Sequence, residues 1–172
     1  MSYHYRLLTR SDQAAFRALR LLGLQLYPEN FLSSYEDEIG VSAEEDRTRL
    51  DQGRMRGLWD AKGRMVGMSG FMPETPQRAA HRAYIGGFMV HPDHHGTGAA
   101  QVLMRNLIAE AKDIGVWQLE LHVNETNLRA RRFYEKHGFR AVGTLPNAIL
   151  TSSGPETDLF MVSDLRDAHS AV

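Results

Sequence analysis

Gly96 and Gly98 stand one residue apart at the junction between a strand-like stretch and a helical one. Pro92 ends the strand, because proline cannot donate to a strand ladder, and from Ala99 the apolar residues follow helical spacing. Glycine permits positive φ and a close approach of the backbone to a ligand. The first N–H groups of a helix have no intrahelical partner, and the helix dipole favours an anion there. These residues suggest a phosphate-binding turn, although a Gly-x-Gly turn before a helix is about as often a plain connection.

The elements that must position this turn form one run of short strands and helices, without a low-complexity linker or an internal repeat. Alternating apolar residues between turn signals predict strands at 3–9, 55–60, 65–72, 82–90, 117–123, 139–144 and 159–162. Helical spacing predicts helices at 14–26, from about residue 31 with a break near Gly40, at 99–114 and at 128–136. We expect Ser11 to cap the first helix, and Ser42 to form a capping box with Glu45 in the second helical region. This order predicts one domain over residues 1–172, with a mixed α/β sheet and helices on both faces.

The composition restricts the classes of partner and of chemistry. The 172 residues are 42% hydrophobic and 24% charged, and the net charge of −1 gives no electrostatic case for nucleic acid or an anionic membrane. The chain has no cysteine, which excludes disulfides, thiol catalysis and cysteine-ligated zinc. His91, His94 and His95 cannot be presented by one helix, because Pro92 and Gly96 interrupt it, so we expect no metal. The N-terminus lacks a signal-peptide layout and no apolar run could span a membrane, so the expected location is cytoplasmic.

Two motifs carry a family resemblance. Residues 90–100 read Val-x-Pro-x-x-His-Gly-Thr-Gly-Ala-Ala, which resembles the acetyl-CoA signature of the GNAT N-acetyltransferases, usually Gln/Arg-x-x-Gly-x-Gly/Ala. Residues 127–139 read Asn-x-x-Ala-x-x-x-Tyr-x-x-x-Gly-Phe, which resembles the second motif of that family. The resemblance covers nearly the whole chain and implies the GNAT fold, a mixed, mostly antiparallel central sheet with helices on both faces. In that fold the strand with Gly86 and Gly87 splays apart from the strand that starts at Trp117.

The resemblance implies that acetyl-CoA is the co-substrate. Backbone groups of Phe88, Met89 and Val90 would pair with the pantetheine arm between the splayed strands. The residues that would wrap the pyrophosphate are His95, Gly96, Thr97, Gly98, Ala99 and Ala100. Asn127 and Tyr134 complete the expected cofactor contacts. His95 departs from the family's Gln or Arg, and since a histidine with an ordinary pKa of about 6.5 is mostly neutral at pH 7, a permanent cation is lost there.

Transfer of an acetyl group to an amine needs a base for the amine, a donor for the carbonyl oxygen and an acid for the leaving thiolate. Tyr134 is the candidate acid, as in the family, and its alternative is a packed core tyrosine. His122 is the candidate base, with Glu120 on the same strand face because side chains alternate; a packed histidine is an equal alternative. Tyr84 and His81 are further candidates for the base.

The predicted function is therefore direct, acetyl-CoA-dependent transfer of an acetyl group to a primary amine, without a covalent enzyme intermediate because no cysteine is available. The alternative is an acyl-CoA-binding sensor with little or no catalysis. The acceptor, a small amine or a protein amino group, cannot be read from the sequence, and the oligomeric state is open, with a homodimer as one option. Acidic residues at 36–38 and 44–46 are either a solvated surface or an acceptor region suited to a cationic amine.

Overall fold

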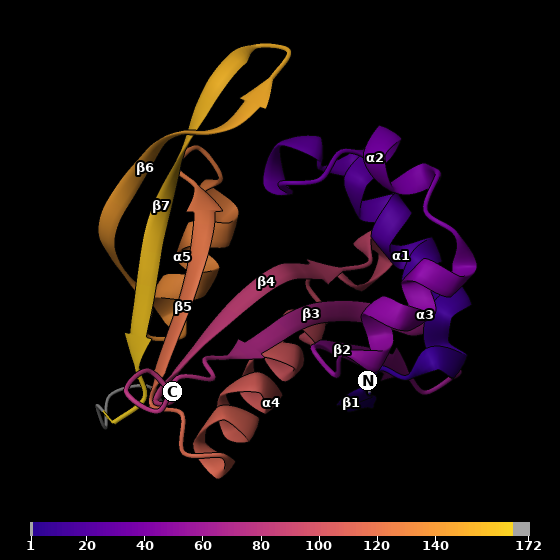
Figure 1. Ribbon diagram of the computed structural model, residues 1–172, viewed down its shortest axis with the longest axis horizontal. Helices are drawn as coiled ribbons and strands as arrows, with labels where there is room; N and C mark the ends of the chain where they lie inside the picture. The colour runs from indigo at the N-terminus through magenta and orange to yellow at the C-terminus, as the bar shows by residue number, and fades with distance from the viewer. Residues whose placement is uncertain (1, 167–172) are drawn as a thin grey trace. The chain divides into compact units, whose positions relative to one another are not determined.

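The computed structural model describes residues 2–166 as two compact units, unit 1 (residues 2–71 and 87–107) and unit 2 (residues 72–86 and 108–166) (Figure 1). The strands are β1 (Tyr3–Leu7), β2 (Met55–Asp60), β3 (Met65–Pro73), β4 (Arg82–Val90), β5 (Gln118–Asn124), β6 (Arg140–Thr151) and β7 (Gly154–Asp164). The helices are α1 (Gln13–Leu26), α2 (Tyr35–Ile39), α3 (Ala43–Asp51), α4 (Ala99–Asp113) and α5 (Leu128–Lys136). Both β4 and α4 contribute residues to each unit.

The strands are hydrogen-bonded in the order β1-β2-β3-β4-β5-β7-β6. β1 with β2, β2 with β3, β5 with β7 and β6 with β7 are antiparallel, whereas β4 and β5 are parallel. The predicted fold class, a mixed and mostly antiparallel α/β sheet, is confirmed. The β4–β5 pairing covers only Arg82–Tyr84 and Gln118–Glu120, whereas β5 continues to pair with β7 as far as Asn124.

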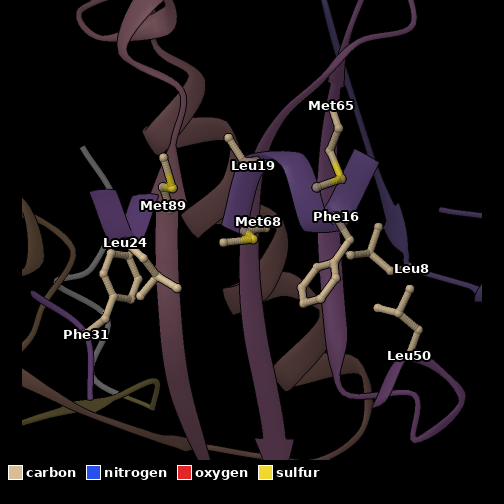
Figure 2. Close-up of a cluster of buried hydrophobic side chains, with 9 residues drawn as sticks. All are labelled: Leu8, Phe16, Leu19, Leu24, Phe31, Leu50, Met65, Met68 and Met89. Atoms are coloured by element: carbon tan, nitrogen blue, oxygen red, sulfur yellow. The ribbon is translucent and has the colours of Figure 1, made fainter. Parts of the chain in front are cut away.

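In unit 1, helices pack on both faces of the strands. Met68 of β3 lies in the buried cluster that α1 covers, and Figure 2 shows the nine side chains of this cluster: Leu8, Phe16, Leu19, Leu24, Phe31, Leu50, Met65, Met68 and Met89. The neighbouring Gly67 points to the opposite face, because side chains alternate along a strand, and a Cβ there would lie 3.4 Å from Leu103 of α4. Gly23 costs helix propensity inside α1, but a Cβ at this position would overlap the sulfur of Met89, so glycine lets α1 approach β4.

In unit 2, β5 has one apolar and one polar face. Leu119 and Leu121 are almost completely buried, whereas Glu120, His122 and Asn124 alternate with them and point to the other side. The apolar face belongs to the core of this unit, to which Met161 of β7 also contributes. The polar face therefore carries Glu120 and His122, the two candidate bases on this strand.

Local signals in the sequence account for most element boundaries. The predicted capping box is confirmed, since the Ser42 hydroxyl accepts from the Glu45 N–H and the Glu45 carboxylate accepts from the Ser42 N–H. Gly115 and Gly138 follow α4 and α5 with φ of 81° and 83°, the left-handed conformation that glycine supplies at helix ends. β2 and β3 form a hairpin, with Gly63 in its loop at φ 74°.

Two predictions about elements are wrong. Ser11 does not cap α1, because a short 3₁₀ helix, Arg10–Asp12, precedes it. The carboxylate of Asp12 accepts from both the N–H and the hydroxyl of Thr9, so Thr9 is the cap residue of that turn. The last two strands are also much longer than 139–144 and 159–162. β6 continues through Pro146 and Asn147, where the β6–β7 register shifts and Asn147 takes a φ of 55°.

Candidate active site

The glycine turn of unit 1 leads directly into α4. Gly96 and Gly98 have φ of 75° and 89°, so both occupy conformations that L side chains rarely adopt. A Cβ built at either position would meet nothing within 4 Å. Glycine is thus required there by backbone conformation, and the space in front of the turn is open. Because α4 begins at Ala99, its first N–H groups have no partner inside the helix and can bind an anion.

The ring of His95 folds back onto the strand that precedes the turn. Its Nε2 donates to the carbonyl oxygen of Val90 over 3.0 Å, and its ring lies 6.4 Å from that of Tyr27. The hydrogen bond joins the turn to the end of β4. The GNAT signature usually has Gln or Arg at this position. The sequence did not indicate this hydrogen bond between His95 and Val90.

The end of β4 combines buried side chains with a backbone irregularity. Met89 and Val90 are buried, Phe88 is half-buried, and the His91 N–H donates to the Val66 carbonyl of β3 over 2.8 Å. Gly87 takes a φ of 58° in the middle of the strand, which regular strand geometry does not allow. The regular strand geometry of β4 is therefore interrupted at Gly87.

On the polar face of unit 2, the carboxylate of Glu120 is engaged. Arg82 of β4 donates to it over 3.2 Å and Gln118 donates to the same oxygen over 2.7 Å. The residue is only 8% exposed. A carboxylate held in this way accepts a substrate proton only at the expense of an ion pair, so the contacts favour a structural role for Glu120.

His122 lies on the same face with different neighbours. Its Nδ1 is 3.2 Å from the Tyr84 hydroxyl, and its ring stacks on Phe160 of β7 with the centroids 5.0 Å apart. The side chain is exposed. Burial raises the pKa of Tyr84, and a hydrogen bond with the His122 backbone partly offsets this, so the Tyr84 hydroxyl is protonated at neutral pH. The imidazole is accordingly oriented by two aromatic residues and remains accessible.

Asp158 of β7 is a residue that sequence analysis missed. It pairs in register with Asn124, two residues from His122, and its Oδ1 is buried without a hydrogen-bond partner. Burial raises the pKa of Asp158, the proximity of His122 lowers it, and Glu156 raises it further. The predicted strand at 159–162 excluded this carboxylate, because β7 begins earlier, at Gly154. A longer predicted strand would have included it.

Asn127 and Tyr134 lie on α5. The Asn127 Oδ1 accepts from the Ala130 N–H over 3.0 Å, so this residue caps the helix. Tyr134 is 8% exposed, with its ring edge-on to Phe133 and Phe139 at 5.5 and 5.8 Å between centroids. Burial raises the pKa of Tyr134 far above its ordinary value, and Tyr84 contributes to the increase. Its hydroxyl therefore keeps its proton at neutral pH and can act as a donor.

The acidic segments of α2 and α3 are paired with arginines. Glu38 accepts from Arg20 of α1 over 3.0 Å and from Arg49 over 2.9 Å, and Asp46 accepts from Arg17 over 3.0 Å. Burial by itself would raise the pKa of Glu38, but the two arginines lower it. These carboxylates join three helices, which favours the structural interpretation of the acidic segments.

The predicted residues fall into two groups. Unit 1 holds Phe88, Met89, Val90 and the turn from His95 to Ala100, and unit 2 holds Glu120, His122, Asn127 and Tyr134. Within residues 2–166, no three histidine, aspartate or glutamate side chains gather closely enough to hold a metal ion. None of the helices described is both long and apolar enough to cross a lipid bilayer.

Comparisons with known proteins identify the family of the chain. The sequence profile of the Acetyltransferase (GNAT) family matches residues 17–139. The chain is 43% identical over 74 residues to the uncharacterized N-acetyltransferase Rv2669 of Mycobacterium tuberculosis, covering 43% of this chain and 46% of that one. It is 32% identical over 88 residues to the uncharacterized N-acetyltransferase YycN of Bacillus subtilis, covering 48% and 54%. The match thus spans about half the length of these relatives.

Solved structures share the fold at low sequence identity. A GNAT-family acetyltransferase from Streptococcus pneumoniae superposes with a TM-score of 0.81 at 19% identity, covering 95% of this chain and 99% of that one. The structure of yncA from Salmonella typhimurium, which contains its cofactor acetyl-CoA, superposes with a TM-score of 0.80 at 18% identity, covering 100% and 98%.

Proposed function

The chain belongs to the GNAT acetyltransferase family, and from this premise we propose that it transfers the acetyl group of acetyl-CoA directly to a primary amine. The observation that carries the proposal is the Gly96–Gly98 turn at the start of α4, inside the region that matches the family. The acceptor is proposed to be a small or protein-borne primary amine, and the compartment the cytoplasm.

The proposed binding of acetyl-CoA depends on backbone groups of unit 1. The diphosphate would accept hydrogen bonds from N–H groups between His95 and Ala100, which the open space in front of both glycines leaves accessible. The pantetheine arm would pair with the backbone of Phe88 to Val90. Asn127, which caps α5, is a further proposed contact of the cofactor. Because backbone N–H groups supply the diphosphate contacts, the replacement of the family's Gln or Arg by His95 is compatible with cofactor binding.

In the proposed reaction, acetyl-CoA supplies a thioester, a C–N bond forms and the C–S bond breaks. One amine proton goes to His122, and the hydroxyl proton of Tyr134 goes to the leaving thiolate. A backbone N–H at the interrupted strand near Gly86 and Gly87 would donate to the carbonyl oxygen. A neutral imidazole has a single N–H, so Nε2 of His122 can accept a proton when Nδ1 donates to the Tyr84 hydroxyl. This assignment requires no covalent intermediate on the protein.

The contacts of the two candidate bases favour His122 over Glu120. Glu120 is buried and holds two donors, Arg82 and Gln118. His122 is exposed, and its hydrogen bond with Tyr84 occupies only Nδ1. Proton transfer to Glu120 would break an ion pair, whereas transfer to His122 would not.

Two measurements on one preparation test the proposal. Calorimetric titration gives the affinity for acetyl-CoA, and a free-thiol assay follows CoA release with a panel of small amines, amino acids and peptides with free N-termini. We expect binding and amine-dependent CoA release, both of which weaken in Gly98→Val. Tight binding without release for every amine would favour the acyl-CoA sensor, and a lack of binding would contradict the proposal.

A further inference from the structure

The N-terminal strand contacts the glycine turn through one side chain. The hydroxyl of Tyr3 in β1 lies 2.6 Å from the Thr97 hydroxyl and 3.0 Å from Nδ1 of His94. Thr97 stands between the two glycines, and its hydroxyl lies 2.7 Å from the carbonyl oxygen of His94. Three residues thus form a closed ring of hydrogen bonds behind the turn.

The direction of each bond in the ring follows from the number of protons available. A carbonyl oxygen can only accept, so the single hydroxyl proton of Thr97 goes to the His94 carbonyl. Thr97 Oγ1 must then accept from Tyr3, which uses the single phenolic proton. The Tyr3 oxygen accepts in turn, so His94 Nδ1 carries a proton and donates. The ring therefore places a proton on Nδ1 of His94 and fixes one orientation of each hydroxyl.

Neighbouring groups hold His94 and Tyr3 in this geometry. His94 is 7% exposed, and its ring is edge-on to Tyr3 with the centroids 5.8 Å apart. Its Nε2 lies 3.7 Å from Oδ2 of Asp60, the residue that pairs in register with Tyr3 across β1 and β2. Asp60 is itself fixed by Arg64, whose Nε donates over 2.9 Å. The ring is consequently anchored to two paired strands.

The backbone hydrogen bond at Thr97 is the long one among those around the turn, so a side-chain anchor at this residue matters. The Thr97 N–H donates to the His94 carbonyl over 3.4 Å, which is at the long end for a hydrogen bond. Two glycines with positive φ flank Thr97, and glycine has the largest conformational freedom to lose. The side-chain ring spans this glycine-flanked residue and returns to the backbone at His94.

We propose that Tyr3, His94 and Thr97 position the turn between Gly96 and Gly98 for the diphosphate of acetyl-CoA. By holding the turn in one conformation before the ligand arrives, they reduce the ordering cost of binding. None of the three side chains needs to touch the ligand. The inference rests on the proposed function, since it assigns the diphosphate as the group that the turn receives.

The experiment compares two ligands that share the pantetheine arm but differ in the diphosphate. Dissociation constants for acetyl-CoA and for S-acetylpantetheine are measured by calorimetry and NMR titration on wild type, Tyr3→Phe, Thr97→Val and Thr97→Ser. We expect Tyr3→Phe and Thr97→Val to weaken acetyl-CoA binding about three- to tenfold, the range for one lost hydrogen bond. S-acetylpantetheine binding should change less than about twofold. Thr97→Ser, which keeps the hydroxyl, should bind acetyl-CoA with an affinity close to that of the wild type.

Controls separate this role from general stabilisation. Tyr5→Phe removes the same atom from the same strand and should leave both affinities unchanged. Amide hydrogen exchange at Thr97 and Gly98 in the ligand-free protein should be faster in Tyr3→Phe than in wild type. Equal affinity of wild type and Tyr3→Phe for acetyl-CoA, or an equal loss for both ligands, overturns the inference while the proposed function stands. A wild-type protein that binds neither ligand overturns the proposed function as well.

Discussion

Replacing Gly98 by alanine is the substitution whose two effects can be separated most cleanly. In the structure, Gly98 has a φ of 89°, and a Cβ there would meet nothing within 4 Å. The cost to folding is thus backbone strain alone, without a steric clash. A non-glycine residue in the left-handed region costs about 1–2 kcal/mol. For a domain of this size, that corresponds to a fall in Tm of about 2–8 °C.

The effect on binding has a different origin. Backbone strain at residue 98 is present in both the free and the bound protein, so it cancels from the affinity as long as the turn keeps its conformation. A turn that relaxes toward negative φ, or a methyl group in the space of the diphosphate, reduces the affinity directly. We expect Gly98→Ala to weaken acetyl-CoA binding by at least about tenfold, or 1.4 kcal/mol.

Gly63→Ala is the matched control. Gly63 has a φ of 74° in the hairpin between β2 and β3, and a Cβ there also meets nothing within 4 Å. Thermal unfolding should therefore show a similar loss of stability in both variants, whereas calorimetry should show weaker acetyl-CoA binding only in Gly98→Ala. Equal acetyl-CoA affinity in the two variants would refute the assignment of the turn to the diphosphate.

Three further predictions concern the reaction and the stability. Tyr134→Phe should lower kcat about 10–10³-fold with little change in KM for acetyl-CoA, and kcat within about twofold of wild type in steady-state kinetics would make Tyr134 a packing residue. In the wild type, kcat/KM should rise with pH as the base loses its proton. His122→Ala should remove this rise, whereas Glu120→Gln should retain it; the reverse result would transfer the role of base to Glu120. Asp12→Asn should cost about 1–2 kcal/mol of unfolding free energy at pH 7, because hydrogen bonds from Arg6 lower the pKa of Asp12 to about 2. This contribution is present above about pH 4 and is lost as the pH falls toward 2. Denaturant titrations should therefore give a larger difference in unfolding free energy between the two proteins at pH 7 than at pH 2.5.

Local patterns in the sequence predicted the elements whose determinants are local. The Ser42–Glu45 box and the glycines after α4 and α5 act within a few residues, so they were readable from the sequence. The start of α1 could not be predicted in this way, because the Asp12 carboxylate accepts hydrogen bonds from both Thr9 and the more distant Arg6. The length of β6 was also hidden, because Asn147 is accommodated by a register shift that only pairing with β7 defines.

The candidate site divides in the same way. The glycine turn and the interruption at Gly87 follow from residues adjacent in sequence. The ring of Tyr3, His94 and Thr97 joins residues more than 90 positions apart, and no spacing rule relates them. Similarly, no spacing rule relates His122 to Asp158, which the register of β5 with β7 brings near each other. Side-chain partners across strands are set by register, which the sequence alone leaves undetermined.

The central claim, direct transfer of an acetyl group to an amine, is tested most directly by following the acetyl carbon. The protein is incubated with acetyl-CoA labelled with ¹³C at the carbonyl and with a panel of primary amines, and the carbonyl resonance is recorded by NMR. The account predicts that the thioester signal converts into an amide signal with at least one amine, without an intermediate bound to the protein, and more slowly in Tyr134→Phe. A label that remains a thioester with every amine while acetyl-CoA stays bound, or that accumulates on the protein itself, would contradict it.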